Sequence, residues 1–439
     1  MEILFFFAAI IAGTFLSAFL SCLPALHIYN VAGLLLLIAI KLQTFLPGDI
    51  LATFLMSMVV SYAFLNTIPS IFLGAPDESA IFMVLPGNKY LMHGKGYEAA
   101  VLTGLGSLGA ILFLAAIVPL APVVLPKIRR ALTPHLFWIV GTILFFLIMT
   151  EWPKGGQRGE TGWHRFWDGW KNLVAGLATL FLSGLLGFVI LYKPIMPVEY
   201  AFQNIMPAFV GLFAIPWIIQ NITSKGVPPK QHVAESVDVT MPLILRGVGA
   251  GSFGGLFAAI FPVVTGGMGG LIAGHATSQH DDRLFIISQG ASKVVYYVGA
   301  FMLLFVPGVG MTRGGMAWML SGFYRPFGWE SYYMIMAVIM FSGIFSFFLL
   351  LWFSRLTVKL IDRVDYRLLS KITFFFIVGV VYFMTGFAGI CLMIVATGIG
   401  LIPVFFHSRR MNCMGILLIP ITLNMAGLGP TVAGWLGLL

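Results

Sequence analysis

The stretch that decides the fold is GVGAGSFGGLFAAIFPVVTGGMGGLIAG, residues 247–274. Ten of its 28 residues are glycine, Pro262 and Thr265 lie near its middle, and it carries no charge. In hydrocarbon, a broken helical turn frees N–H and C=O groups that lipid cannot pair. Such backbone persists at membrane depth only where protein or a watery cavity surrounds it. We therefore expect an interrupted helix here that forms half of a transport site.

The composition indicates that most of the chain lies within a lipid bilayer. The 439 residues are 59% hydrophobic and 9% charged, and the mean hydropathy is +0.98. Uncharged runs recur along the whole length, and one span takes about 20 apolar residues. We predict an all-α polytopic protein of roughly ten to twelve transmembrane helices, multi-pass in the cytoplasmic membrane.

The net charge of +9 comes from loops, so it indicates orientation and not nucleic-acid binding. Basic residues cluster at 127–130, 355–371 and 409–410. Because cytoplasmic loops are enriched in Lys and Arg, we place these clusters on the cytoplasmic side. The loop 151–171 then falls outside.

The chain divides into two predicted halves, residues 1–224 and 239–439. A polar linker, residues 225–238, carries Pro228-Pro229 and joins them.

Each half contains interrupted hydrophobic segments, near 20–33 and 61–76 in the first and near 247–274 in the second. Aligning Pro24 with Pro262 brings the first and last of these into register. Interrupted segments at corresponding positions are typical of transporter repeats. We predict two structural repeats with two re-entrant or broken-helix hairpins, and we favour inverted over parallel topology.

In the first half, neutral polar side chains surround a proline that leaves one carbonyl unpaired. Asn66, Thr67 and Ser70 surround Pro69 in this way, and such groups suit a carboxylate or a sodium ion. A proline kink sealed by the same side chains is an equally good interpretation.

In the second half, Thr265, Gly266 and Gly267 offer successive backbone amides for an anion. The alternative is small-residue packing. Packing explains Gly247 and the glycines that follow it at four-residue spacing, but not a proline followed by two glycine pairs.

Four cations interrupt apolar stretches: Arg246, Lys293, Arg313 and Arg325. Intramembrane charges are costly and default to functional candidates. Lys293 could neutralise an anionic substrate, whereas snorkelling to the interface accounts for Arg246 and Arg325.

Two further sets complete the candidate site. Asp77 is expected to cap the following helix, while its neighbour could bind a coupling proton or cation. The predicted helix breaks or hinges are Pro24, Pro76, Pro262, Gly269 and Gly270, and the coupling-ion candidates are Asn30, Glu78, Thr277 and Ser278.

Short motifs in the first half resemble the large permease subunit of tripartite tricarboxylate transporters, and its archaeal-type branch most closely. These are NTIP at 66–69, GAPDE at 74–78, LPG at 85–87 and GKGYEA at 94–99. The resemblance implies a secondary transporter of two related halves that moves di- or tricarboxylates with a cation gradient. Such permeases work with a small membrane subunit and an extracytoplasmic solute-binding protein.

The leading hypothesis is a secondary active transporter that moves a small organic anion by alternating access, coupled to sodium or protons. The alternative is a lipid-anion translocase, for example for a polyisoprenyl phosphate, with Lys293 and Arg313 on the phosphate. An intramembrane enzyme using His275 and Asp281 receives little weight, because the histidines at 275 and 280 do not share a helical face. We expect no metal and no cofactor besides the coupling ion. The expected partners are the anion and membrane lipid, with a homodimer left open.

Overall fold

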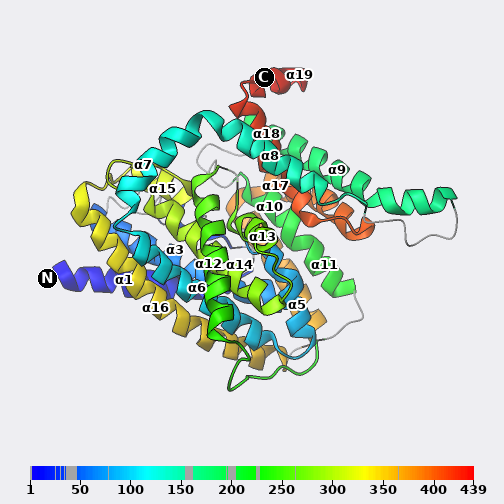
Figure 1. Cartoon of the computed structure of the whole chain (residues 1–439). Coiled ribbons are helices and arrows are strands. Elements are labelled where there is room, and N and C mark those ends of the chain that lie inside the picture. The colour runs from blue at the N-terminus through cyan, green and yellow to red at the C-terminus, as the bar shows by residue number, and fades with distance from the viewer. Residues whose placement is uncertain are drawn as a thin grey trace. The chain divides into compact units, whose positions relative to one another are not determined.

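The computed structural model is helical throughout its regular structure (Figure 1). It describes residues 2–24, 26–29, 31–33, 35, 47–77, 79–153, 162–193, 195, 204–223, 228–262, 264–363 and 365–439. Within these ranges ten helices are long and apolar enough to cross a membrane, or up to eleven if one bent pair counts as a span. The prediction of an all-α polytopic membrane protein is confirmed.

The chain forms two compact units, and each is described by itself. The first unit comprises residues 1–130 and 221–377, and the second comprises residues 131–220 and 378–439. Each unit therefore combines one segment from the first predicted half with one segment from the second. This division differs from two consecutive halves, and the internal repeat stays a prediction.

The first unit is built around a buried helix, α14, which packs between α12 and α6. Of the spanning window in α14, 89% is buried inside the protein. Helices α1, α3 and α16 pack beside one another (Figure 1), and residues 228–240 contain no helix. The helices are α1 (Glu2–Ser21), α3 (Gly48–Leu65), α4 (Thr67–Phe72), η1 (Ile81–Met83), α5 (Val84–Met92), α6 (Gly96–Ile117), α7 (Ala121–Leu132), α12 (Met241–Ile260), α13 (Gly266–Ala276), α14 (Asp282–Met302), α15 (Gly314–Ser321) and α16 (Gly328–Ile361).

Glycines let α12 approach its neighbours closely. A Cβ on Gly251 would lie 2.1 Å from the Ser288 carbonyl oxygen, and one on Gly255 would lie 2.4 Å from that of Ser292. These glycines serve helix packing, as expected from their spacing.

The glycine pair at 269–270 was expected at a helix break, and this expectation is wrong. Both residues lie inside α13. A Cβ on Gly269 would lie 2.1 Å from the carbonyl oxygen of Gly254 on α12. The residue is needed for close approach of two helices, and it does not end one.

The break lies between Ile260 and Gly266, around Pro262. Arg313 covers the carbonyls that this break frees. Its Nε donates to the Ala259 oxygen at 3.0 Å, and its Nη2 donates to the Ala258 oxygen at 3.3 Å and also to the Phe261 oxygen. The last carbonyls of a helix have no partner within it, so Arg313 acts as the cap of α12.

A second break separates α3 from α4 at Asn66. The Ser70 hydroxyl donates to the Asn66 carbonyl at 2.8 Å, which seals part of the opened backbone. Helix α4 ends at Phe72, and Gly74 follows with a φ of 62°. The chain then reaches Pro76 outside any helix.

The second unit contains a buried glutamate at the end of α8. Glu151 is 8% exposed, and its Oε1 accepts from Asn412 Nδ2 at 3.0 Å and from the backbone N–H of Arg409. The helices are η2 (Thr133–His135), α8 (Leu136–Met149), α9 (Gly162–Tyr192), α10 (Met206–Phe209), η4 (a π-helical turn, Val210–Ala214), α11 (Ile215–Thr223), η5 (Arg410–Met414), α18 (Gly415–Met425) and α19 (Gly429–Trp435), with α17 (Tyr366–Phe406) entering from the first unit.

This contact corrects the predicted orientation. Glu151 begins the loop that was placed outside, whereas Arg409 belongs to a cluster that was placed on the cytoplasmic side. Residues joined by a hydrogen bond cannot lie on opposite faces of a bilayer about 30 Å thick. The segment after α17 packs against α9, so the basic residues at 409–410 lie beside the start of the loop 151–171.

Candidate functional site

The side-chain amide of Asn66 joins a partly buried carboxylate to a buried ammonium. Its Nδ2 donates to Asp77 Oδ2 at 2.6 Å. Lys293, on α14, donates from Nζ to Asn66 Oδ1 and to Thr67 Oγ1. This amide orientation satisfies both neighbours, because an ammonium only donates and an ionised carboxylate only accepts. The helix break at Asn66 thus places two polar side chains from the first half against Lys293.

Asp77 is the hub of this cluster. Its Oδ2 also accepts from the hydroxyls of Tyr62 at 2.9 Å and Tyr297 at 2.8 Å. Its Oδ1 accepts from the backbone N–H groups of Ser79 at 3.0 Å and Ala80 at 2.7 Å. Asp77 therefore caps the turn at Ser79 and Ala80, whereas it was predicted to cap the helix that follows; η1 begins after this turn at Ile81, with Ala80 as its N-cap. Asp77 also holds the site together, which was not predicted.

The segment that follows Pro24 closes one side of the cluster. His27 Nε2 lies 3.2 Å from the Tyr297 hydroxyl. Its ring packs on Tyr62 with centroids 5.1 Å apart and on Tyr29 with centroids 4.6 Å apart. The break after α1 therefore contributes an aromatic wall to the site.

Lys293 is 2% exposed. No described carboxylate lies within 4 Å of it, so within the described parts of the chain its hydrogen bonds go to the two neutral side chains. Burying an ammonium without an ion pair costs several kcal/mol. A membrane protein keeps such a group where function needs it.

The N-terminus of α13 lies directly over this turn of α14. A Cβ on Gly266 would lie 2.9 Å from the Lys293 Cα, and the Ser292 hydroxyl donates to the Gly266 carbonyl at 2.6 Å. Thr265 is the N-cap of the helix, with its hydroxyl 3.4 Å from the Met268 N–H. A Cβ on Gly267 would lie 2.8 Å from the Ser79 carbonyl oxygen. The amides at this helix start carry a partial positive charge.

The structure thus brings together six of the predicted site residues, from both halves of the sequence: Asn66, Thr67, Thr265, Gly266, Gly267 and Lys293. Pro69 and Ser70 lie in α4 and belong to the break itself. Ser70 therefore fits the kink interpretation of this segment, while a binding role for Asn66 and Thr67 stays a prediction.

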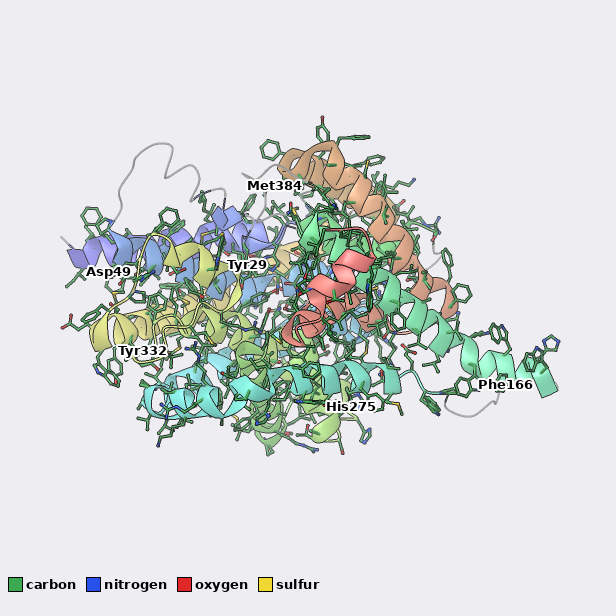
Figure 2. The ribbon with its side chains drawn as sticks, turned by 90° about the horizontal axis from the view of Figure 1, so that it is seen from above. Tyr29, Asp49, Phe166, His275, Tyr332 and Met384 are labelled. Atoms are coloured by element: carbon green, nitrogen blue, oxygen red, sulfur yellow. The ribbon has the colours of Figure 1, made fainter. Side chains whose placement is uncertain are left out.

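The coupling-ion candidates do not join the cluster in the described residues. Thr277 and Ser278 follow the C-terminal end of α13, roughly 15 Å along the helix from its start. Figure 2 shows His275, at that end, well apart from Tyr29 of the cluster. Asn30 and Glu78 lie outside the described residues.

Two residues that the sequence analysis did not place in the site, Gln289 and Tyr297, share one helix face with the predicted Lys293. The three follow one another at four-residue spacing on α14, so their side chains line one stripe. Their four-residue spacing in the sequence already indicates that these side chains share a helix face. Nothing local in the sequence would have linked the stripe to Asp77.

The enzyme hypothesis finds no assembled centre. His275 is exposed, and Asp281 bonds to Arg283. Within the described ranges no three His, Cys, Asp or Glu side chains group around a metal position.

Broken helices around a buried polar cluster are an architecture of multi-pass transporters. Residues 7–415 match the family model described as the Tripartite tricarboxylate transporter TctA family. The chain belongs to this family, which is a family of transporters. It is also similar to the uncharacterized protein MJ1079 of Methanocaldococcus jannaschii, with 26% identity over 428 residues, covering 96% of this chain and 98% of that protein. No solved structure matches this chain.

Proposed function

We propose that this protein is a permease that carries a small organic anion, a di- or tricarboxylate, across the cytoplasmic membrane by alternating access. The observation that carries the proposal is the buried ammonium of Lys293, held by Asn66 and Thr67 beneath the start of α13. The family supports a transporter. The substrate, the coupling ion and the transport cycle are proposals that go beyond the family assignment.

The charges of the site favour an anion. Lys293 supplies a full positive charge, and the first amides of α13 add a partial one. Asp77 offsets part of this charge from the other side of the Asn66 amide. A carboxylate entering beside Lys293 would therefore meet hydrogen-bond donors and positive charge.

The coupling ion is a proton or a sodium ion, and Lys293 favours the proton. A lysine can give up the proton that carries its charge, whereas an arginine stays charged. In the cycle we propose, Lys293 releases its proton on the side of the membrane where protons are scarce, and the carboxylate then loses the charge that holds it. Proton and anion would move together.

The tripartite family name supports two partners, a small membrane subunit and an extracytoplasmic solute-binding protein. The lipid-anion alternative assigns the phosphate to Lys293 and Arg313. The guanidinium of Arg313 instead caps α12, which leaves Lys293 alone in that role. No observation on the described residues favours it over the carboxylate permease.

The test is flux into proteoliposomes that hold the purified chain, with labelled citrate and an imposed proton or sodium gradient. We expect uptake driven by the proton gradient, and citrate exchange without any gradient. Uptake that follows sodium alone would overturn proton coupling. The absence of both uptake and exchange, with the solute-binding protein added, would overturn the carboxylate permease.

A further inference from the structure

One buried amide in the first unit has no partner among the residues that the structure describes. Gln289 is 2% exposed, and neither its Nε2 nor its Oε1 has a hydrogen-bond partner among the described residues. Buried polar groups are nearly always paired, so an unpaired one requires an explanation. Neither the cluster around Asp77 nor the packing of α14 uses this amide.

The amide faces the same helix start that covers Lys293. A Cβ on Gly270 would lie 2.8 Å from Gln289 Nε2, so the side chain lies against the second turn of α13. On α14, Gln289 precedes Lys293 by four residues, which places the two side chains on one face, roughly 5–6 Å apart at Cβ.

A second unpaired group lies on the same face of α13. Ser79 is 1% exposed, and its hydroxyl has no partner in the described parts of the chain. Its backbone carbonyl faces Gly267, one turn before Gly270. Two residues with deeply buried, unpaired polar side chains, Gln289 and Ser79, therefore contact the first two turns of α13, whose first residue lies against Lys293.

The chemistry of an amide defines what would pair it. The Gln289 side chain presents N–H donors and a carbonyl acceptor together. A carboxylate could satisfy only the donors, and it would face the carbonyl oxygen with like charge. A hydroxyl group both donates and accepts, so it satisfies both ends, and Ser79 can add a third hydrogen bond.

We propose that Gln289 and Ser79 bind a hydroxyl group of the transported anion next to the carboxylate at Lys293, so that the site selects hydroxy acids. This inference rests on the proposed carboxylate permease and adds the group that decides specificity. A site built to bond a hydroxyl strongly rejects the analogue that lacks it, because its buried polar groups are then left unpaired.

The test uses pairs of acids that differ by one hydroxyl, malate against succinate and citrate against tricarballylate. Binding to the purified chain and exchange in proteoliposomes are both measured. We expect the wild type to prefer the hydroxy acid by about tenfold or more. Gln289→Leu should bring each pair to about equal affinity, whereas Gln279→Leu, at the far end of α13, should keep the preference. A wild type without preference would overturn the inference and leave the proposed function standing.

A second measurement is independent of transport. Without ligand, Gln289→Leu should keep or raise the melting temperature, because it removes two unpaired buried groups. A lower melting temperature would mean that a buried water pairs the amide for structural reasons, and this would overturn the inference even if no acid binds. If Gln289→Leu does not fold, Ser79→Ala must weaken the hydroxyl preference instead. If neither acid of either pair binds, it is the proposed function that fails.

Discussion

Lys293 donates a hydrogen bond to the side-chain oxygen of Asn66, which lies 227 residues earlier in the sequence. The same amide donates to Asp77. A single neutral side chain therefore separates a buried cation from a partly buried carboxylate. Among the described residues, Lys293 has no direct ion pair that would neutralise it, so it is available to a negatively charged ligand.

Asn66→Ala should remove this bridge. Both charges would then lose a partner, and the geometry of the pocket would shift, so we expect transport to fall on the order of 10²-fold. The free energy of unfolding should fall by about 1–3 kcal/mol. Flux in proteoliposomes and thermal unfolding in detergent measure the two effects.

The matched control for Asn66 is Asn221, which is buried to a similar degree and donates to the Leu73 carbonyl at 3.0 Å outside the cluster. Asn221→Ala should destabilise the protein but keep its substrate affinity. Equal transport in the two variants would remove Asn66 from the site.

Gly267→Ala tests the close approach over the site. Its Cβ would lie 2.8 Å from the Ser79 carbonyl oxygen, so the start of α13 must move. We expect transport to be lost, with about 1–3 kcal/mol of destabilisation. Gly249→Ala on α12 meets no atom within 4 Å, and it should keep full activity with stability unchanged or up to about 1 kcal/mol higher. Normal flux in Gly267→Ala would contradict this account.

The sequence was sufficient to predict the membrane class and the breaks. Hydrophobic run length indicates spans whatever their packing. Pro262 marks backbone that cannot stay helical, and the polar Asn66 before Pro69 marks the short break between α3 and α4. The predicted role of Gly269 was wrong, because a glycine that allows helix contact and one that ends a helix look alike in sequence. Only the position of Gly254 opposite it separates the two.

The candidate site was predicted in part. The sequence marks two features as unusual for their surroundings: neutral polar side chains beside a helix break, and one lysine in an apolar run. Asp77 was assigned a local capping role, which it has. Its contacts with Tyr62 and Tyr297 depend on how α3 and α14 pack, and no local pattern encodes that packing.

Arg313→Gln should act on stability and not on substrate binding. The guanidinium covers three carbonyls at the end of α12, so we expect a loss of about 1–3 kcal/mol in the free energy of unfolding. The apparent KM for the transported acid should stay as in the wild type. Arg325→Gln, at an exposed position, should change neither quantity. A large rise in KM with unchanged stability would restore Arg313 as a ligand-binding residue.

Asp281 should make stability weakly dependent on acid pH. Hydrogen bonds from Arg283 hold the pKa of the Asp281 carboxyl below its ordinary value. A lowered folded-state pKa means that the contribution is present above about pH 4 and is lost as the pH falls through the folded pKa. The effect should be small, because the pair is exposed to solvent.

The matched variant is Asp281→Asn, which keeps a side chain able to cap α14 but removes the charge. Melting temperatures of this variant and the wild type should differ slightly at pH 6, and the difference should shrink as the pH falls below about 4. A difference that grows toward low pH would contradict the assignment.

The most direct test of the central claim is binding of labelled citrate to wild-type protein and to Lys293→Met. We predict that the wild type binds and that the variant binds about 30-fold or more weakly, as expected for removing a buried charged partner. Its melting temperature should not fall, because the change removes a buried charge. Lys359→Met, on an exposed part of α16, should bind as the wild type does. Undiminished citrate binding by Lys293→Met would contradict an anion site at this lysine.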